Sequence, residues 1–138
     1  MKYFVDTSAL IALADRTDQY HSRATQFVRR LTTEPQFHTS NYILNEMITR
    51  LRFTVGVNTA LEFAISMKGS HLYTIHTVDH KIEALALTVL KKYADHPLSF
   101  TDCTTMVLMD RLGMSQIFAF DDDFRKVGYQ LVPVHILM

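Results

Sequence analysis

The chain has 138 residues, which suit one domain that can bury roughly 70% of its unfolded surface without disulfides. Apolar residues make up 48% and charged residues 20%, an ordinary composition that excludes a disordered chain. The 14 basic and 14 acidic residues cancel, so there is no polybasic signature and charge alone does not indicate nucleic-acid binding.

The cysteine content and the start of the chain bear on location. Cys103 is the single cysteine, which excludes an intrachain disulfide and a thiolate zinc site and suits a reducing compartment. The run from Met1 to Asp6 reaches a carboxylate too early for a secretory signal. No apolar run approaches the ~20 residues of a transmembrane helix. We therefore expect a cytoplasmic protein with no membrane partner.

The first half of the chain alternates short apolar runs with helical patterns. Pro35 interrupts the second helical pattern, and Ser40 is a plausible N-cap for the third. We predict a strand over residues 2–5, helices over 9–14 and 18–31, a strand over 36–39, and helices over 41–53 and 57–67.

The second half continues this alternation. Thr77 could cap a long helix whose apolar face includes Ile82 and Leu85. Ser99 then opens a helix that Gly113 ends. We predict strands over residues 71–76, 116–120 and 130–134, and a helical turn over 121–126. Alternating strands and helices favour a single α/β domain over residues 1–138, with a largely parallel sheet and helices on both faces.

Four carboxylates stand at positions that could converge. In open α/β sheets, ligands bind just beyond the carboxyl ends of the strands. Asp6 and Asp121 each follow a predicted strand directly, Glu46 lies early in the helix after the second strand, and Asp102 lies in the first turn of another helix. The spacing makes these residues candidates for one site.

Each carboxylate also has a structural explanation. Asp6 and Asp121 could cap the helices that follow them. Asp102 stands in the N3 position of a capping box that begins at Ser99, and Glu46 could pair with Arg50 one helical turn later. Spacing by itself does not decide between a site and four structural roles.

Four motifs surround these carboxylates: Val5-Asp6-Thr7-Ser8-Ala9-Leu10, Asn45-Glu46-Met47, Ser99-Phe100-Thr101-Asp102 and Phe120-Asp121-Asp122-Asp123-Phe124. Read together, they resemble the PIN-domain family and most closely its VapC-type toxins from type II toxin–antitoxin systems. The resemblance covers essentially the whole chain. One departure is Ala119, where the family often has Thr or Ser.

The resemblance implies a three-layer α/β/α domain and a metal-dependent endoribonuclease. Asp6 and Asp102 would be the principal metal ligands, and Glu46 and Asp121 would complete the shell. Asp123 is the alternative to Asp121. Three further residues are secondary candidates near the site: Thr7, Ser8 and Arg50. An RNA substrate, an antitoxin protein and a homodimer are the partners that the family implies.

The chemistry of such a cluster indicates the metal. Two unit charges ~4 Å apart repel by about 4 kcal/mol at an effective dielectric near 20, so converging carboxylates need a cation or a proton. An all-oxygen site suits Mg²⁺ or Mn²⁺. The seven histidines show no metal-ligand spacing, which argues against zinc.

Two other functions remain open. A PIN-like chain with weak catalysis could serve as an RNA- or protein-binding module. A phosphoryl-transfer enzyme on a doubly wound fold is the other class, but a dehalogenase-like phosphatase would need a second Asp at position 8, where this chain has Ser8.

Overall fold

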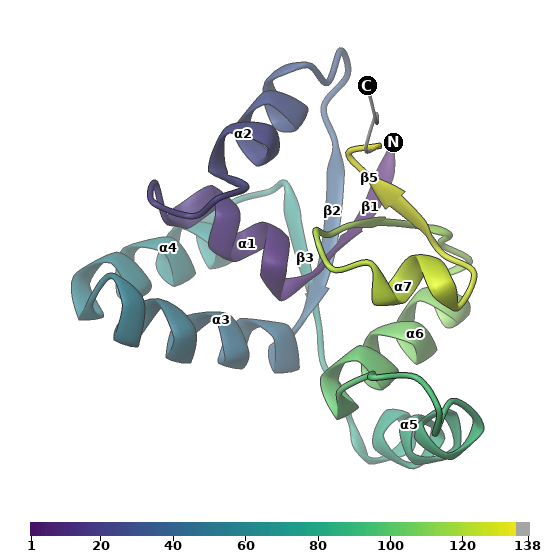
Figure 1. Cartoon of the computed structure of the whole chain (residues 1–138). Helices are drawn as coiled ribbons and strands as arrows, with labels where there is room; N and C mark the ends of the chain where they lie inside the picture. Colours follow the sequence, from purple (N-terminus) through teal and green to yellow (C-terminus); the bar gives the residue numbers. More distant parts are fainter. Residues whose placement is uncertain (135–138) are drawn as a thin grey trace.

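A parallel five-stranded sheet runs through the middle of the molecule in this computed structural model, which describes residues 1–134 (Figure 1). The strand order is β3-β2-β1-β4-β5, and each neighbouring pair is parallel. The strands are β1 (Lys2–Val5), β2 (Gln36–Ser40), β3 (Tyr73–His76), β4 (Gln116–Phe118) and β5 (Gln130–Val132).

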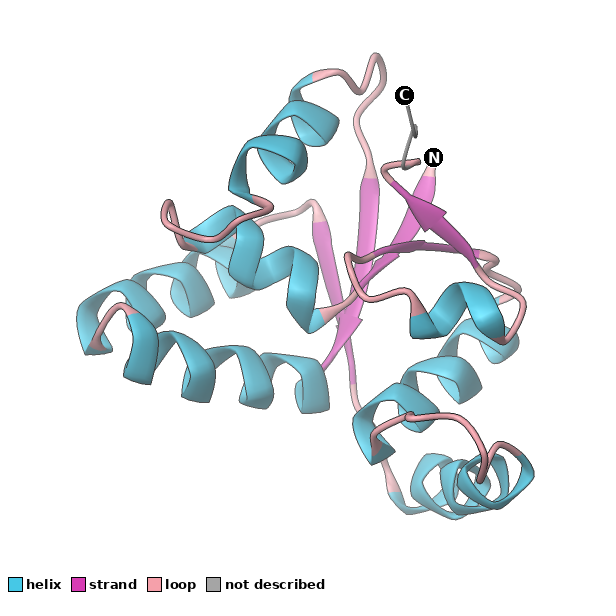
Figure 2. Ribbon diagram, in the orientation of Figure 1, coloured by secondary structure: helices cyan, strands magenta, loops and turns pink. Residues whose placement is uncertain are grey.

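Helices cover both faces of this sheet (Figure 2). The chain steps from β1 to β2 to β3 in one direction, then returns to β4 and continues to β5 in the other. Right-handed crossovers therefore place the first four helices on one face and the last three on the opposite face. They are α1 (Thr7–Ala14), α2 (His21–Arg29), α3 (Asn41–Thr54), α4 (Val57–Gly69), α5 (His80–Lys92), α6 (Phe100–Leu112) and α7 (Asp123–Lys126).

The core lies on both faces of the central strands. Phe4, Val5 and Phe118 are fully buried, as expected for parallel strands covered on both sides. On the α2 face, Phe27 packs against the ring of Phe118 at a centroid distance of 4.8 Å. The predicted three-layer α/β/α class is confirmed. Residues 135–138, which the expected domain includes, lie outside the described residues.

Helix starts follow capping side chains, and one predicted cap is wrong. Asp6 caps α1, so the helix begins at Thr7 rather than at Ala9. Asp79, not Thr77, caps α5 by accepting a hydrogen bond from the backbone of Ile82 at 3.0 Å. A carboxylate two residues nearer the helix thus sets its start.

Other boundaries differ by a few residues from the predictions. β4 ends at Phe118, because the backbone of Phe120 bonds to the Ser8 side chain instead of to a strand, and β5 ends at Val132. Leu85, which we predicted on the apolar face of the helix that is α5, is 45% exposed, so that prediction is wrong for this residue. Within residues 1–134, no helix is both long and apolar enough to cross a membrane.

Candidate active site

The sheet reverses its winding direction between β1 and β4. From β1 the chain leaves toward β2, and from β4 it leaves toward β5. The two strands end level with each other, with Val5 paired to Phe118. The crevice beyond such a reversal is where open α/β sheets bind ligands.

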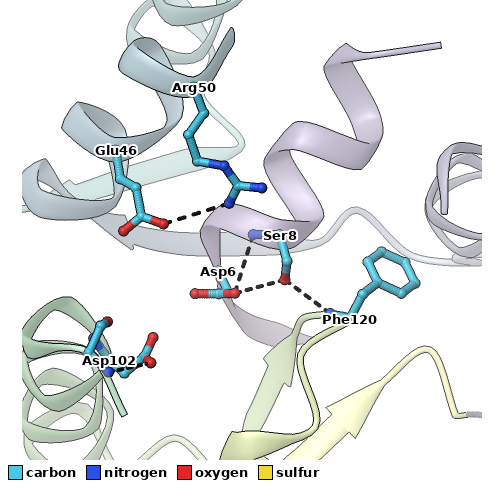
Figure 3. A network of polar contacts seen from close by, with 7 residues as sticks. Asp6, Ser8, Glu46, Arg50, Asp102 and Phe120 are labelled. Carbon is cyan, nitrogen blue, oxygen red and sulfur yellow. Dashed lines mark hydrogen bonds and ion pairs between the residues drawn. The ribbon is translucent and has the colours of Figure 1, made fainter. Parts of the chain in front are cut away.

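Asp6 occupies the floor of this crevice. It follows β1 directly, and its backbone donates to the carbonyl of Phe118 at 3.0 Å. Its Oδ2 accepts two hydrogen bonds from Ser8, one from Oγ at 2.7 Å and one from the backbone at 3.2 Å. The hydroxyl of Ser8 also accepts from the backbone of Phe120 at 3.0 Å, which ties the loop after β4 to α1 (Figure 3). The position of the Asp6 carboxylate is therefore held by two segments 112 residues apart.

Asp102 reaches the crevice from the opposite face of the sheet. Ser99 and Asp102 form the predicted capping box, with the Asp102 carboxylate accepting from the Ser99 backbone at 2.9 Å. Asp102 can cap α6 and also belong to the site, because the cap uses only one oxygen of its carboxylate, Oδ2. The capping box fixes the side chain at the first turn of α6.

Glu46 comes from α3 and pairs with Arg50 one turn later, as expected. The closest contact joins Glu46 Oε1 to Arg50 Nη1 at 3.7 Å, and both side chains are partly exposed. At that distance and exposure the pair contributes little to stability. The guanidinium keeps a positive charge beside the crevice.

The last carboxylate comes from the loop after β4. Asp121 lies beside the crevice, and its Oδ1 accepts from the backbone of Asp123 at 3.1 Å. Asp122 points elsewhere and pairs with Arg125 through two hydrogen bonds of 2.7 Å. Asp121 lines the pocket in the crevice, and Asp123 is not among the lining residues.

These groups line one pocket of about 240 Å³. Thr7 also lines it, and its hydroxyl is buried without a hydrogen-bond partner within residues 1–134. A buried hydroxyl in that condition fits a ligand or water bound in the pocket. The full lining is Asp6, Thr7, Ser8, Glu46, Arg50, Pro97, Ser99, Asp102 and Asp121.

Burial and neighbouring negative charges raise the pKa of two carboxyl groups in this pocket, those of Asp6 and Asp102. Burial, opposed by the Ser8 hydrogen bonds, raises the pKa of Asp6, and the charge of Glu46 adds to this effect. Burial raises the pKa of Asp102 to about 6, with further contributions from the charges of Asp6 and Asp121. A site whose ionised form is disfavoured in this way has a strong affinity for protons or cations.

The donor set fits a hard divalent cation, although the side chains are spread apart. Within residues 1–134, no three His, Cys, Asp or Glu side chains are grouped closely enough to hold one ion together. Mg²⁺ typically keeps several waters and takes only one or two carboxylates directly, so a loosely spaced carboxylate pocket suits it. Neither cysteine nor histidine lines the pocket, which agrees with a hard ion rather than zinc.

Two side-chain contacts could not be predicted from the sequence. The spacing of the histidines in the sequence indicates no shared site, yet the rings of His38 and His76 hydrogen-bond at 2.8 Å between β2 and β3. Tyr20 and Phe120 stack beside the carboxylate pocket, with centroids 4.7 Å apart. Only strand pairing and helix packing could reveal either contact, because the partners are 38 and 100 residues apart.

The model of the PIN domain family matches residues 3–129. The 23S rRNA-specific endonuclease VapC20 of Mycobacterium tuberculosis is 31% identical over 128 residues, which cover 91% of this chain and 94% of the relative.

Solved structures agree with this match. The crystal structure of Mycobacterium tuberculosis VapC20, described as a sarcin–ricin loop cleaving toxin, superimposes with a TM-score of 0.85 at 29% identity, covering 92% of this chain and 95% of that one. FitAcB of Neisseria gonorrhoeae shares the fold, with a TM-score of 0.68 at 12% identity, covering 95% and 96%. A family match over most of the length and a relative of this identity lead to one conclusion: the chain belongs to the PIN-domain family.

Proposed function

We propose that this protein is a metal-dependent endoribonuclease and the toxin of a toxin–antitoxin pair. The observation that carries the proposal is the convergence of Asp6, Glu46, Asp102 and Asp121 on one pocket from four separate segments. The 31% identity to a 23S rRNA-specific endonuclease supports RNA as the substrate class.

The proposal gives each carboxylate a role. Asp6 and Asp102 are the principal ligands of Mg²⁺ or Mn²⁺, because burial raises the pKa of both and each is held by a local cap. Glu46 and Asp121 complete the shell or orient the attacking water. A bound divalent cation would polarise the scissile phosphate and lower the pKa of a water molecule.

Neighbouring groups position the substrate and the ligands. Arg50 lines the pocket and offers its charge to a phosphate oxygen. Ser8 holds the Asp6 carboxylate, and the unpaired hydroxyl of Thr7 can donate to a bound water or phosphate. Asp123 remains the secondary candidate, next to Asp121.

Partners and location follow from the same proposal. We infer an antitoxin protein that blocks the pocket and a homodimer as the working form. We place the activity in the cytoplasm, where RNA is abundant and a free thiol such as Cys103 stays reduced. Co-expression with the product of an adjacent short reading frame should relieve toxicity, and light scattering should give twice the chain mass of 15.9 kDa.

The first test compares RNA cleavage by the wild type and by Asp6→Asn and Asp102→Asn variants, with Mg²⁺, Mn²⁺ or EDTA. The substrates are 23S rRNA within ribosomes and purified tRNAs. We expect metal-dependent cleavage that falls about 100-fold or more in each variant, because the loss of a ligand removes several kcal/mol of transition-state stabilisation.

Asp79→Asn is the matched control, since Asp79 is also an N-cap aspartate but lies outside the pocket. It should retain full activity. Equal cleavage by all four proteins would trace the activity to a contaminant. Metal-dependent RNA binding without cleavage would instead support the catalytically weak binding module.

A further inference from the structure

A second hollow, of about 680 Å³, lies beside the carboxylate pocket. Its lining includes the rings of Tyr20 and Phe120 together with the side chains of Arg23 and Arg125. The volume falls within the range of ordinary small-molecule sites. None of these four residues lines the carboxylate pocket, so the two hollows have distinct walls.

The aromatic part of the lining is a flat stack. The rings of Tyr20 and Phe120 are nearly parallel, at an interplanar angle of 4° and a centroid distance of 4.7 Å. The guanidinium of Arg23 lies 5.4 Å from the Phe120 centroid and 5.9 Å from that of Tyr20. Aromatic rings beside an arginine are the surface on which unpaired nucleobases stack.

The two arginines differ in the availability of their charge. Arg125 donates two hydrogen bonds to Asp122, and the charges of these two side chains neutralise each other. Arg23 forms no ion pair with any residue in 1–134. Its positive charge is therefore available to a phosphate, in a neighbourhood where the adjacent aspartates would otherwise repel one.

The hollow is continuous with the proposed site through the chain itself. Phe120 immediately precedes Asp121, and its backbone donates to the Ser8 hydroxyl that holds Asp6. The Phe120 ring is directed away from the side chains of Asp6 and Asp102 (Figure 3). Phe120 and Asp122 line this hollow, whereas Asp121 between them lines the carboxylate pocket, so a nucleotide chain with one phosphate among the carboxylates can place a neighbouring base at the stack.

We propose that this hollow binds an unpaired RNA base next to the scissile phosphate. The base stacks on an outer face of the Tyr20–Phe120 ring pair, and Arg23 contacts the phosphate of the same nucleotide. This inference rests on the proposed ribonuclease function and adds a base-binding subsite formed by this hollow.

The test measures binding instead of cleavage, in an Asp102→Asn background. The probes are an unstructured 8-nucleotide RNA and a matched oligomer of abasic ribose phosphates, each labelled for fluorescence anisotropy. Phe120→Leu and Tyr20→Leu should each weaken RNA binding about 10-fold, as expected for the loss of one stacked base. Neither should alter the weaker binding of the abasic oligomer, whereas Arg23→Gln should weaken both.

Phe53 and Arg52 provide a matched control, because Arg52 lies 5.4 Å from the centroid of the Phe53 ring at the exposed end of α3, outside both hollows. Phe53→Leu and Arg52→Gln should leave binding unchanged. Phe120→Tyr should retain binding, which separates stacking from a folding defect.

Some outcomes would overturn the assignment. These are unchanged RNA binding in Phe120→Leu and Tyr20→Leu, equal weakening of both probes, or no RNA binding by the Asp102→Asn protein. A failure of the nuclease proposal would appear separately, as absent cleavage by the wild type.

Discussion

The Ser8 hydroxyl connects two parts of the molecule through a single oxygen atom. It donates to Asp6 at 2.7 Å and accepts from the backbone of Phe120 at 3.0 Å. A similar turn occurs at Asp15, whose carboxylate accepts from the hydroxyl of Thr17 at 2.7 Å and from its backbone at 2.9 Å. Within residues 1–134, the Thr17 hydroxyl accepts no hydrogen bond comparable to the one that Ser8 accepts from Phe120. A comparison of the two turns therefore separates the effect of the local hydrogen bonds from that of the long-range hydrogen bond to Phe120.

Ser8→Ala should destabilise the protein by about 1–3 kcal/mol, because it leaves the Asp6 carboxylate and the Phe120 amide short of partners. It should also reduce RNA cleavage. Thr17→Ala removes the corresponding local bond and should cost only about 1 kcal/mol, with cleavage retained. Urea unfolding and initial cleavage rates check both variants, and an equal loss of activity in the two would contradict the prediction.

At the scale of elements, two glycines at helix ends differ in their backbone conformation. Gly113 ends α6 in the left-handed conformation, at φ 66°, and the next amide donates to the carbonyl of Met109 at 2.9 Å. Gly69 is the last residue of α4 and has no positive φ. A methyl group added at either glycine would meet no atom within 4 Å. Any difference between the two substitutions must then come from backbone conformation.

Gly113→Ala should lower the free energy of unfolding by about 1 kcal/mol or more, because a Cβ is strained in the left-handed region. Gly69→Ala should be neutral or stabilising by up to about 1 kcal/mol, since alanine favours the helix. Urea denaturation of the two variants and the wild type measures both effects. A similar stability change in both would show that conformation is not the cause.

The pairing of β2 with β3 brings together two histidines that share one hydrogen bond. One ring nitrogen must donate and the other accept, so the pair cannot hold two extra protons and keep the bond. Burial lowers the pKa of both His38 and His76, and the charges of His76 and Lys2 lower that of His38 further. Both folded-state pKa values thus lie below the unfolded value, and the unfolded chain binds more protons in acid.

The stability contributed by this pair is therefore present above about pH 6.5 and is lost as the pH falls through the folded pKa values. The melting temperature of the wild type should fall more between pH 7.5 and pH 5 than that of a His38→Gln/His76→Gln variant. His71→Gln, at a histidine with a side chain 77% exposed, is the control and should follow the wild type. Parallel melting curves for all three proteins would contradict this explanation.

At the scale of the whole molecule, the ionised carboxylates of the pocket lower the stability of the fold around them. Asp6 and Asp121 come from the ends of β1 and β4, and Glu46 and Asp102 come from helices on opposite faces of the sheet. Burial at this point, with smaller contributions from the charges of Asp6 and Asp121, raises the pKa of Asp102 to about 6, so the ionised site weakens the fold at neutral pH. Binding of a cation should reverse this penalty.

Asp102→Asn should raise the metal-free melting temperature by a few degrees, because the amide oxygen can still accept from Ser99 but carries no charge. Mg²⁺ or Mn²⁺ should stabilise the wild type, by about 2.7 kcal/mol at 100 times the dissociation constant, and should have little effect on the variant. Thermal melts with EDTA, Mg²⁺ and Mn²⁺ measure this. Identical responses to the ions would remove the carboxylates as their site.

The sequence by itself determined the elements and the candidate carboxylates. Hydrophobic periodicity and capping residues act over a few neighbouring positions, so the alternation of strands and helices, the Ser99–Asp102 box and the Glu46–Arg50 pair could be predicted. Boundaries were missed where a contact outside the element decides them, as at the end of β4.

Only the tertiary structure decided which of these residues meet. The reversal of strand order between β1 and β4 brings Asp6 and Asp121 together, and nothing in the local pattern specifies that order. The same holds for the His38–His76 bond and the stack of Tyr20 on Phe120. Contacts between distant residues depend on how whole strands and helices pack, because no short-range periodicity or cap encodes them.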